Sequence, residues 1–233
     1  MISRLGKNIP FVATLVDQQA ALFGHGCRVR GDAKVPFGTG AFALAITGAS
    51  PIVNRRGMDP TVAWEYCGEE ALYALDAGDY TAAAAVDWTI SLGLAHNLAD
   101  FDLPQEPSAL ERGMAFVPPL AGLTAPHWDR AAAGMWIGLR QDTTAAQMRR
   151  AVLEGIALRC VELIEGLPAL GGRPISADGV LVSNHGFVQF FTDALGSPVQ
   201  LKLTHELTSL ARPKWVSSGL VVSHPNVMQM AID

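Results

Sequence analysis

Two successive strand pairs near the start of this sequence restrict the fold more than any other feature does. Residues 33–47 (AKVPFGTGAFALAIT) predict two strands joined at a Gly-Thr-Gly turn. Residues 61–66 (TVAWEY) and 71–76 (ALYALD) predict a second hairpin. Because consecutive hairpins place their strands side by side, we expect an antiparallel meander.

Helical segments follow the meander and alternate with further strands. The Ala-rich residues 80–95 predict a helix, and residues 144–167 predict a longer one with a capping threonine and a broad apolar face. A buried strand is expected at 179–184, a helix at 186–195 and a strand at 198–203. The sequence therefore predicts an α/β domain, in which a mixed sheet with an antiparallel meander is flanked by helices.

Composition excludes several classes of protein. Of the 233 residues 49% are apolar and 17% charged, which excludes a disordered chain. The net charge of −5 gives no reason to expect nucleic acid or an acidic membrane surface as a partner. No apolar run approaches the ~18 residues needed to span a bilayer, and the first residues lack the pattern of a signal peptide. We expect a cytoplasmic protein.

The stretch FVATLVDQQAALFGHGC (residues 11–27) predicts a buried strand that runs into a helix, with Asp17 at the junction. Two roles suit this carboxylate. It can cap the helix by accepting hydrogen bonds from free N–H groups of the first turn. It can also act as a catalytic base, since open α/β sheets bind ligands beyond the carboxyl ends of their strands. The residues of this stretch alone favour the cap, which is the commoner use of Asp at such a position.

Several short stretches, taken together in their order, carry more information than any one of them. They are VDQQAALFGHGC, AKVPFGTGAF, TVAW, YALDAGDYTAAAAVDW, FVPPLAGLTAPHWD, GLRQDTT, LEGIALR and VQFFTDALGSPV. This ordered set, over roughly residues 9 to 210, resembles the C-terminal lobe of the FGGY family of carbohydrate kinases, and within it the glycerol kinases. The resemblance implies a domain at 1–210 and a divergent tail at 211–233.

The resemblance implies a fold and a set of roles. Members of this family have two actin-like ATPase lobes with ribonuclease-H-like cores, hinged around a cleft that holds a polyol such as glycerol. By resemblance, Asp17 is the base that takes a proton from the attacking hydroxyl, Gln18 hydrogen-bonds the polyol and Phe42 packs against it. Phosphoryl transfer depends mainly on positioning and charge stabilisation, which suits a carboxylate base. With the resemblance counted, the base is favoured over the cap for Asp17.

The resemblance also implies an ATP site on this lobe. The Gly-Thr-Gly turn corresponds to the turn that approaches the ATP phosphates. Glycines let N–H groups come close to phosphate oxygens, although a plain hairpin turn would have the same sequence. A second turn, which runs from strand to helix at Asp178-Gly179-Val180 and Asn184, is expected to hold the α-phosphate and adenine. The residues expected on the nucleotide side are Gly38, Thr39, Gly40, Ala83, Asp87, Gly179, Val180 and Asn184.

The sequence departs from the family at three of these positions. Val180 replaces the second glycine of an Asp-Gly-Gly motif, so its side chain is expected to intrude on the nucleotide and to oppose a positive φ. Ala83 replaces another glycine, and Asp87 stands where a glutamine is usual and is expected to repel phosphates. At residues 204–215 (THELTSLARPKW) the family has a helix, and Pro213 is expected to break its interior.

The family's N-terminal lobe has no counterpart in these 233 residues. That lobe carries a phosphate loop, the main Mg²⁺ ligands and the arginine that binds the polyol. Two hypotheses follow. In the first, the chain is the nucleotide-binding lobe of an ATP- and Mg²⁺-dependent polyol kinase, inactive without an N-terminal lobe. In the second, it is a non-catalytic remnant that acts as a binding or assembly module. Partners expected besides ATP and polyol are the N-terminal lobe or a second copy of the chain.

Overall fold

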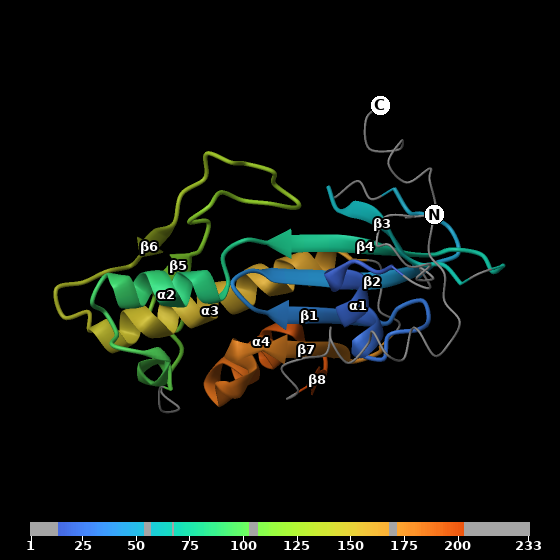
Figure 1. Cartoon of the computed structure of the whole chain (residues 1–233). Helices are drawn as coiled ribbons and strands as arrows, with labels where there is room; N and C mark the ends of the chain where they lie inside the picture. Colours follow the sequence, from blue (N-terminus) through green and yellow to red (C-terminus); the bar gives the residue numbers. More distant parts are fainter. Residues whose placement is uncertain (1–13, 54–56, 67, 103–106, 168–171, 203–233) are drawn as a thin grey trace, which may run out of the picture.

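The computed structural model describes residues 14–53, 57–66, 68–102, 107–167 and 172–202. Its centre is a six-stranded mixed sheet with the strand order β3-β4-β2-β1-β7-β8 (Figure 1). The neighbours from β3 to β1 are antiparallel, whereas β7 pairs in parallel with both β1 and β8. The bounds are β1 Ala33–Phe37, β2 Ala41–Gly48, β3 Asp59–Trp64, β4 Leu72–Asp79, β7 Ile175–Gly179 and β8 Val199–Leu201.

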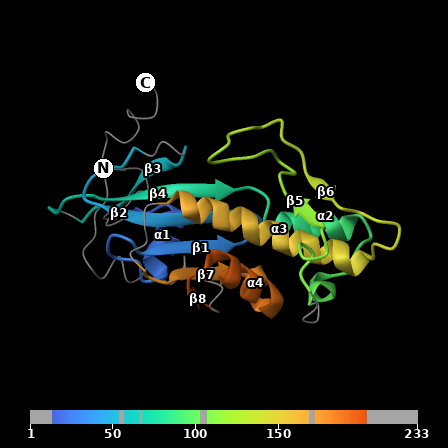
Figure 2. The same ribbon diagram turned by 180° about the vertical axis from the view of Figure 1, so that it is seen from behind.

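Helices cover both faces of the sheet, as the opposite views in Figures 1 and 2 show. Helix α1 (Asp17–Gly24) packs on one face, while α3 (Ala145–Gly166) and α4 (His185–Leu195) pack on the other. Helix α2 (Ala83–Ser91) follows β4 and contacts α3. The remaining elements are the 3₁₀ turns Leu98–Phe101 and Val180–Ser183, and a small sheet of β5 (Ala115–Val117) and β6 (Met135–Ile137).

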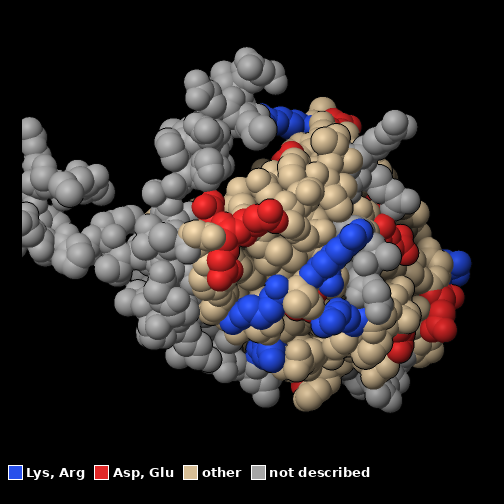
Figure 3. Space-filling model, turned by 90° about the vertical axis from the view of Figure 1, so that its right-hand side faces the viewer, with Lys and Arg blue, Asp and Glu red and all other residues tan. Residues whose placement is uncertain are grey.

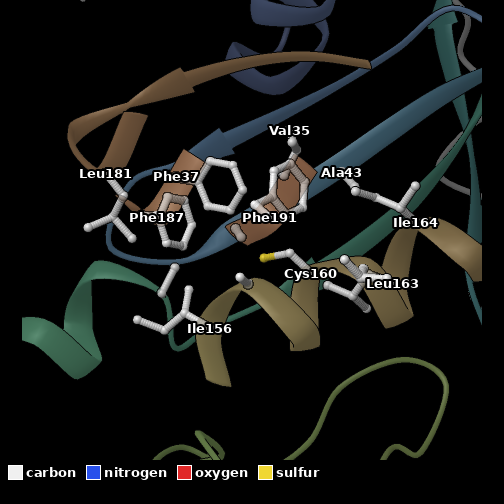
Figure 4. Close-up of a cluster of buried hydrophobic side chains, with 14 of the residues drawn as sticks. Val35, Phe37, Ala43, Ile156, Cys160, Leu163, Ile164, Leu181, Phe187 and Phe191 are labelled. Carbon is white, nitrogen blue, oxygen red and sulfur yellow. The ribbon is translucent and has the colours of Figure 1, made fainter. Parts of the chain in front are cut away.

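The larger apolar core lies between the sheet and helices α3 and α4 (Figure 4). Phe37 of β1 makes edge-to-face contacts with Phe187 and Phe191 of α4, at centroid distances of 4.9 and 5.2 Å. Such pairs add about 0.5–1.5 kcal/mol to the effect of burial. Cys160 of α3 is buried in the same core, and burial raises the pKa of its thiol far above the ordinary value. It therefore packs as a small apolar residue.

Helix α3 begins where its sequence indicates. The Thr144 side chain accepts a hydrogen bond from the N–H of Gln147, and the Gln147 side chain accepts one from the N–H of Thr144. This reciprocal capping box satisfies two of the donors that the first turn leaves free.

The sheet face under α1 carries a smaller apolar cluster and a row of polar side chains. Leu44 and Ile46 of β2 pack against Leu22 of α1 in the apolar cluster. Because Lys34 and Asp76 both pair with Leu44 in register, their side chains lie on this same face. Ser176 pairs with Lys34 and continues the row onto β7. The two faces of one sheet therefore differ sharply in polarity.

Most predicted elements are confirmed, and two strands are not. Both hairpins and the helices at 80–95, 144–167 and 186–195 are present. The strand predicted at 179–184 is wrong: β7 ends at Gly179, and the chain turns there into a 3₁₀ turn. The strand predicted from residue 11 does not extend over 14–16, and its first residues lie outside the described part. The predicted tail at 211–233 lies outside the described part as well.

Charged side chains of both signs lie together on one face of the molecule (Figure 3). In Figure 3, which shows the right-hand side of Figure 1, basic side chains gather with acidic ones beside them. In the described residues, no helix has the length and apolar character required to cross a membrane.

Candidate functional site

Two loops meet at the end of the sheet where the parallel strands β1 and β7 finish. Phe37 and Gly179 pair in register at the carboxyl ends of these strands. The turn Gly38–Gly40 follows the first strand, and Val180 follows the second. In open α/β sheets ligands bind outside the carboxyl ends of neighbouring strands. The structure therefore brings the two predicted nucleotide turns together at one edge.

The turn at residues 38–40 also holds the start of α2. The N–H of Ala83 donates to the Gly38 carbonyl at 3.0 Å, and the N–H groups of Ala82 and Ala84 donate to Thr39 at 3.0 and 3.1 Å. Since α2 has no side-chain cap, these carbonyls satisfy its first donors. Within the described part of the chain, no acceptor is found for the N–H groups of Gly38, Thr39 and Gly40 themselves. Free N–H groups beside an exposed threonine hydroxyl suit the phosphate oxygens of a nucleotide.

Gly179 is the residue that makes the second turn possible. Its φ is +101°, a conformation that side chains oppose. A Cβ there would lie 2.6 Å from the carbonyl carbon of Phe37 and 2.8 Å from the Phe37 nitrogen. Val180 does not have a positive φ, so the strain expected from its side chain is absent. Its side chain is 41% exposed, next to the turn at which the nucleotide is expected.

Asn184 has a structural role that the sequence did not predict. Its Oδ1 accepts a hydrogen bond from the N–H of Phe187 at 2.8 Å, which caps α4. Its Nδ2 donates to the carbonyl of Phe101 at 2.8 Å. The side chain lines a small pocket of about 20 Å³ together with Arg150 and Glu154. Asn184 therefore fixes the wall of this pocket through protein contacts.

Glu154 holds a loop against the same pocket. Its carboxylate is buried, and it accepts hydrogen bonds from the N–H groups of Ala109 at 2.9 Å and Leu110 at 3.3 Å. Arg150 donates to it at 3.1 Å from one turn earlier in α3. The negative charge of Glu154 is therefore compensated by Arg150 and by two N–H groups. Asp87, the other predicted residue on this side, is exposed on α2.

Asp17 is the first residue of α1 and is exposed to solvent. Val16 occupies the N-cap position, and α1 has no side-chain cap bond. The Asp17 Oδ1 accepts a hydrogen bond only from the neighbouring Gln18 N–H, at 2.8 Å, among the described contacts. The structure therefore does not use Asp17 as the N-cap, and its carboxylate is accessible.

Gln18 and Phe42 are joined by a residue that the sequence analysis did not single out. The ammonium of Lys34 donates to Gln18 Oε1 and to the Phe42 carbonyl, each at 3.2 Å. Lys34 is only 1% exposed, and burial lowers its pKa to about 8 against the opposing effect of Asp76 and Asp178. The available signal was a lysine at a strand position whose pattern demands burial.

A second pocket, of about 90 Å³, opens beside Phe42. Asp59, Asp76, Tyr80 and Trp128 also line it. Burial raises the pKa of Asp76 to about 6, although the Lys34 charge acts to lower it. Gly78 leaves room for the aromatic ring, since a Cβ there would lie 2.5 Å from Phe42 Cδ1.

The described residues contain no group of three or more His, Cys, Asp or Glu side chains that could hold a metal ion. The predicted residues instead form two groups. One surrounds the ends of β1 and β7, and the other links α1 to β2 through Lys34. Phe37 to Phe42 is the continuous segment that connects them, so one hairpin serves both.

Comparison with known proteins identifies the family. The profile of the "FGGY family of carbohydrate kinases, C-terminal domain" matches residues 33–210. Glycerol kinase of Myxococcus xanthus is 40% identical over 211 residues, and that of Thermus brockianus is 39% identical over 212. Each alignment covers 88% of this chain and 42% of the relative. The chain thus spans less than half the length of these relatives.

Solved structures agree with the sequence relatives. The crystal structure of Plasmodium falciparum glycerol kinase with ADP has a TM-score of 0.77 and 29% identity, over 84% of this chain and 40% of that one. Xylulose kinase from Lactobacillus acidophilus, at 17% identity and a TM-score of 0.71, shares the fold. The fold is the actin-like ATPase fold, with the mixed sheet described above. The chain therefore belongs to the FGGY family of carbohydrate kinases and carries the C-terminal domain of that family.

Proposed function

We propose that this chain is the nucleotide-binding lobe of an ATP-dependent polyol kinase, and that glycerol is its acceptor. The observation that carries this proposal is the meeting of two turns at the carboxyl ends of β1 and β7, where the N–H groups of residues 38–40 have no acceptor among the described residues. The similarity to glycerol kinases, one of them solved with ADP, supports the choice of ligands.

On the nucleotide side, the main chain does most of the binding. The N–H groups of Gly38, Thr39 and Gly40 and the Thr39 hydroxyl would hold phosphate oxygens. Gly179 and Val180 would lie along the nucleotide, with Asn184 near them and Ala83 against the turn at Gly38. Asp87 is exposed on α2, and its negative charge opposes polyphosphate binding.

On the polyol side, Asp17 is proposed as the base. Its exposed carboxylate can accept the proton of the hydroxyl that attacks the γ-phosphate. Gln18 would hydrogen-bond the polyol, and the ring of Phe42 would pack against its carbons. ATP supplies the phosphoryl group, and the chain's own residues would bind, orient and deprotonate the acceptor.

A complete active site needs more than the described residues provide. They include no metal-binding cluster, so the metal that accompanies ATP is proposed to be held by an N-terminal lobe. Tyr80 and Trp128 beside the second pocket are 54% and 52% exposed, and such a lobe would cover them. We therefore expect no measurable glycerol phosphorylation by this chain alone, since single electrostatic contacts are commonly worth ~10²–10³-fold in rate.

A second candidate function is a non-catalytic binding or assembly module. Val180 favours it, because a 41% exposed side chain occupies the turn at which family members have glycine. Asp87 favours it as well. The two proposals differ in whether the chain binds ATP.

Calorimetry of ATP binding to the wild type and to Val180→Gly tests the proposal. Because the Val180 side chain stands at the turn, its removal is expected to tighten ATP binding by about tenfold, which is about 1.4 kcal/mol. Val188→Gly, in α4, is a control that introduces the same residue away from the turn and is expected to leave affinity per folded molecule unchanged. A coupled assay follows glycerol phosphorylation in parallel.

The outcomes separate the alternatives. Binding that Val180→Gly strengthens supports the nucleotide lobe. Absence of ATP binding by both proteins supports the non-catalytic module. Equal binding by both would mean that the turn at Gly179 is not part of the nucleotide site. Robust turnover by the isolated chain would contradict the need for a second lobe.

A further inference from the structure

Lys34 holds a buried positive charge at the centre of the molecule. It lies on β1, on the sheet face that α1 covers, and only 1% of it is exposed. A buried ammonium is costly unless hydrogen-bonded partners compensate it. Its partners are therefore informative about why the position is occupied by lysine.

The two contacts of the ammonium lie on two different elements. Its Nζ donates to Oε1 of Gln18 on α1 and to the carbonyl of Phe42 on β2, both at 3.2 Å. These are the two residues proposed to contact the polyol. The buried ammonium thus connects the two residues through direct hydrogen bonds.

The contact also determines the orientation of the Gln18 amide. An ammonium can donate hydrogen bonds but cannot accept them. Oε1 must therefore face Lys34, which leaves Nε2 with its two N–H groups free to point away from β1. Gln18 is half-buried, so part of this residue is open to solvent.

Charged groups on several elements surround Lys34. Asp17 of α1, Asp76 of β4 and Asp178 of β7 all favour its charged form, as does Cys27, while burial opposes it. His25 connects to the same group, with Nδ1 2.6 Å from Ser176 Oγ and Nε2 3.4 Å from Asp178 Oδ2. The ammonium is therefore the cationic centre of a buried polar network between α1 and the sheet.

We propose that Lys34 is a positioning residue for polyol binding, which fixes Gln18 with its amide N–H groups directed outward and ties it to the Phe42 strand. The hydroxyl oxygen that meets Gln18 then acts as an acceptor. The identity of the ligand as a polyol rests on the proposed function, whereas the link from Lys34 to Gln18 does not.

Nuclear magnetic resonance of the full chain tests both parts. The side-chain amide of Gln18, assigned by its loss in Gln18→Leu, is followed from about pH 6 to about pH 10, beside the Lys34 signals. The amide is expected to shift with a midpoint near the Lys34 pKa of about 8. In Lys34→Met this midpoint is expected to disappear. Lys202→Met, a half-buried lysine beyond β8, is the matched control and should retain it.

Glycerol is then added to each protein. In the wild type and Lys202→Met it is expected to shift the Gln18 amide, and in Lys34→Met the apparent affinity is expected to fall by about tenfold or more. ATP affinity, measured separately, should be the same in all three. This pattern would distinguish positioning from a general loss of structure.

Other results would overturn the inference. If the chemical shift of the wild-type Gln18 amide does not change as Lys34 titrates, the link from Lys34 to Gln18 is refuted. This result is independent of whether Lys34→Met folds. Glycerol affinity that is equal in folded Lys34→Met and wild type refutes the positioning role, and no glycerol response in the wild type refutes the polyol part. If the wild type shows the expected amide and glycerol responses but does not bind ATP, the proposed function is contradicted and the link from Lys34 to Gln18 is retained.

Discussion

The two proposed halves of the site are constructed differently. The nucleotide end, at the close of β1 and β7, consists of turns in which glycine and main-chain groups do the work. The polyol end consists of side chains held by a buried charge, with Lys34 at its centre. The stability of the first half should therefore change when a side chain is added at a glycine, and it should not depend on pH. The second half should respond to pH through its titrating groups.

The largest effect is expected at the nucleotide end. Gly179→Ala places a Cβ against the Phe37 backbone at a φ of +101°, and neither strand can move away without breaking the β1–β7 pairing. We expect a loss of about 4 kcal/mol in the free energy of unfolding, measured with urea.

A matched control sharpens this result. Gly196→Ala also has a positive φ, +63°, but its Cβ would meet nothing within 4 Å. It should lose only about 1 kcal/mol. Equal losses for the two variants would show that backbone conformation alone, and not the close approach of β1, requires Gly179.

The next effect is expected at the polyol end and depends on pH. The pKa of Lys34 is about 8 in the folded protein, whereas that of an unfolded lysine is about 10.4. Between these values the unfolded chain binds more protons, so the free energy of unfolding should increase as the pH rises, by about 3 kcal/mol in total. Urea denaturation across this range measures the increase.

Lys34→Met should remove this increase, while Gly196→Ala should retain it. If the wild-type stability is constant from pH 8 upward, or declines there to the same degree in both variants, Lys34 does not bear a depressed pKa.

Asp76 should produce the opposite slope at lower pH. Its pKa is about 6 when folded and about 3.9 when unfolded, so the folded protein binds more protons between these values. The free energy of unfolding should fall as the pH rises through this window, by about 2 to 3 kcal/mol. Asp76→Asn should flatten that part of the wild-type profile. A profile that the substitution leaves unchanged would assign the slope to another carboxylate.

The smallest effect is expected at Asn184, again at the nucleotide end. Asn184→Ala removes the cap of α4 and the bond to Phe101, which should cost about 1–2 kcal/mol. Asn184→Asp retains the capping oxygen and loses only the donor, so it should cost less. The reverse order would show that the bond to Phe101 matters more than the cap.

Local signals in the sequence predicted most of the fold. The Gly-Thr-Gly turn between two apolar runs and a threonine cap at the start of α3 depend on neighbouring residues only, and both are as expected. The strand predicted at 179–184 failed because its apolar run is also compatible with a 3₁₀ turn. What decides between them is the positive φ of Gly179, which depends on the approach of β1.

The site was less accessible to sequence reasoning, for the same reason. The turns and Asp17 were found because short motifs mark them, although their roles remain predictions. Lys34 was missed because, within the stretch AKVPFGTGAF, the chemistry of a phosphate turn points to Gly-Thr-Gly and not to the lysine. Its meaning arises from contacts with Gln18 and Phe42 on two other elements, which no local pattern reveals.

The parallel pairing of β1 with β7 has a consequence for how the molecule is made. β1 can pair with β2 as soon as both have left the ribosome, whereas β7 is synthesised only after α2, the small sheet and α3. Closing so long a loop delays folding, because the chain loses conformational entropy before the contacts between its distant segments can stabilise the pairing. The two turns proposed to bind nucleotide are therefore expected to meet late, and a nascent chain that stops before residue 179 has the first turn without its counterpart.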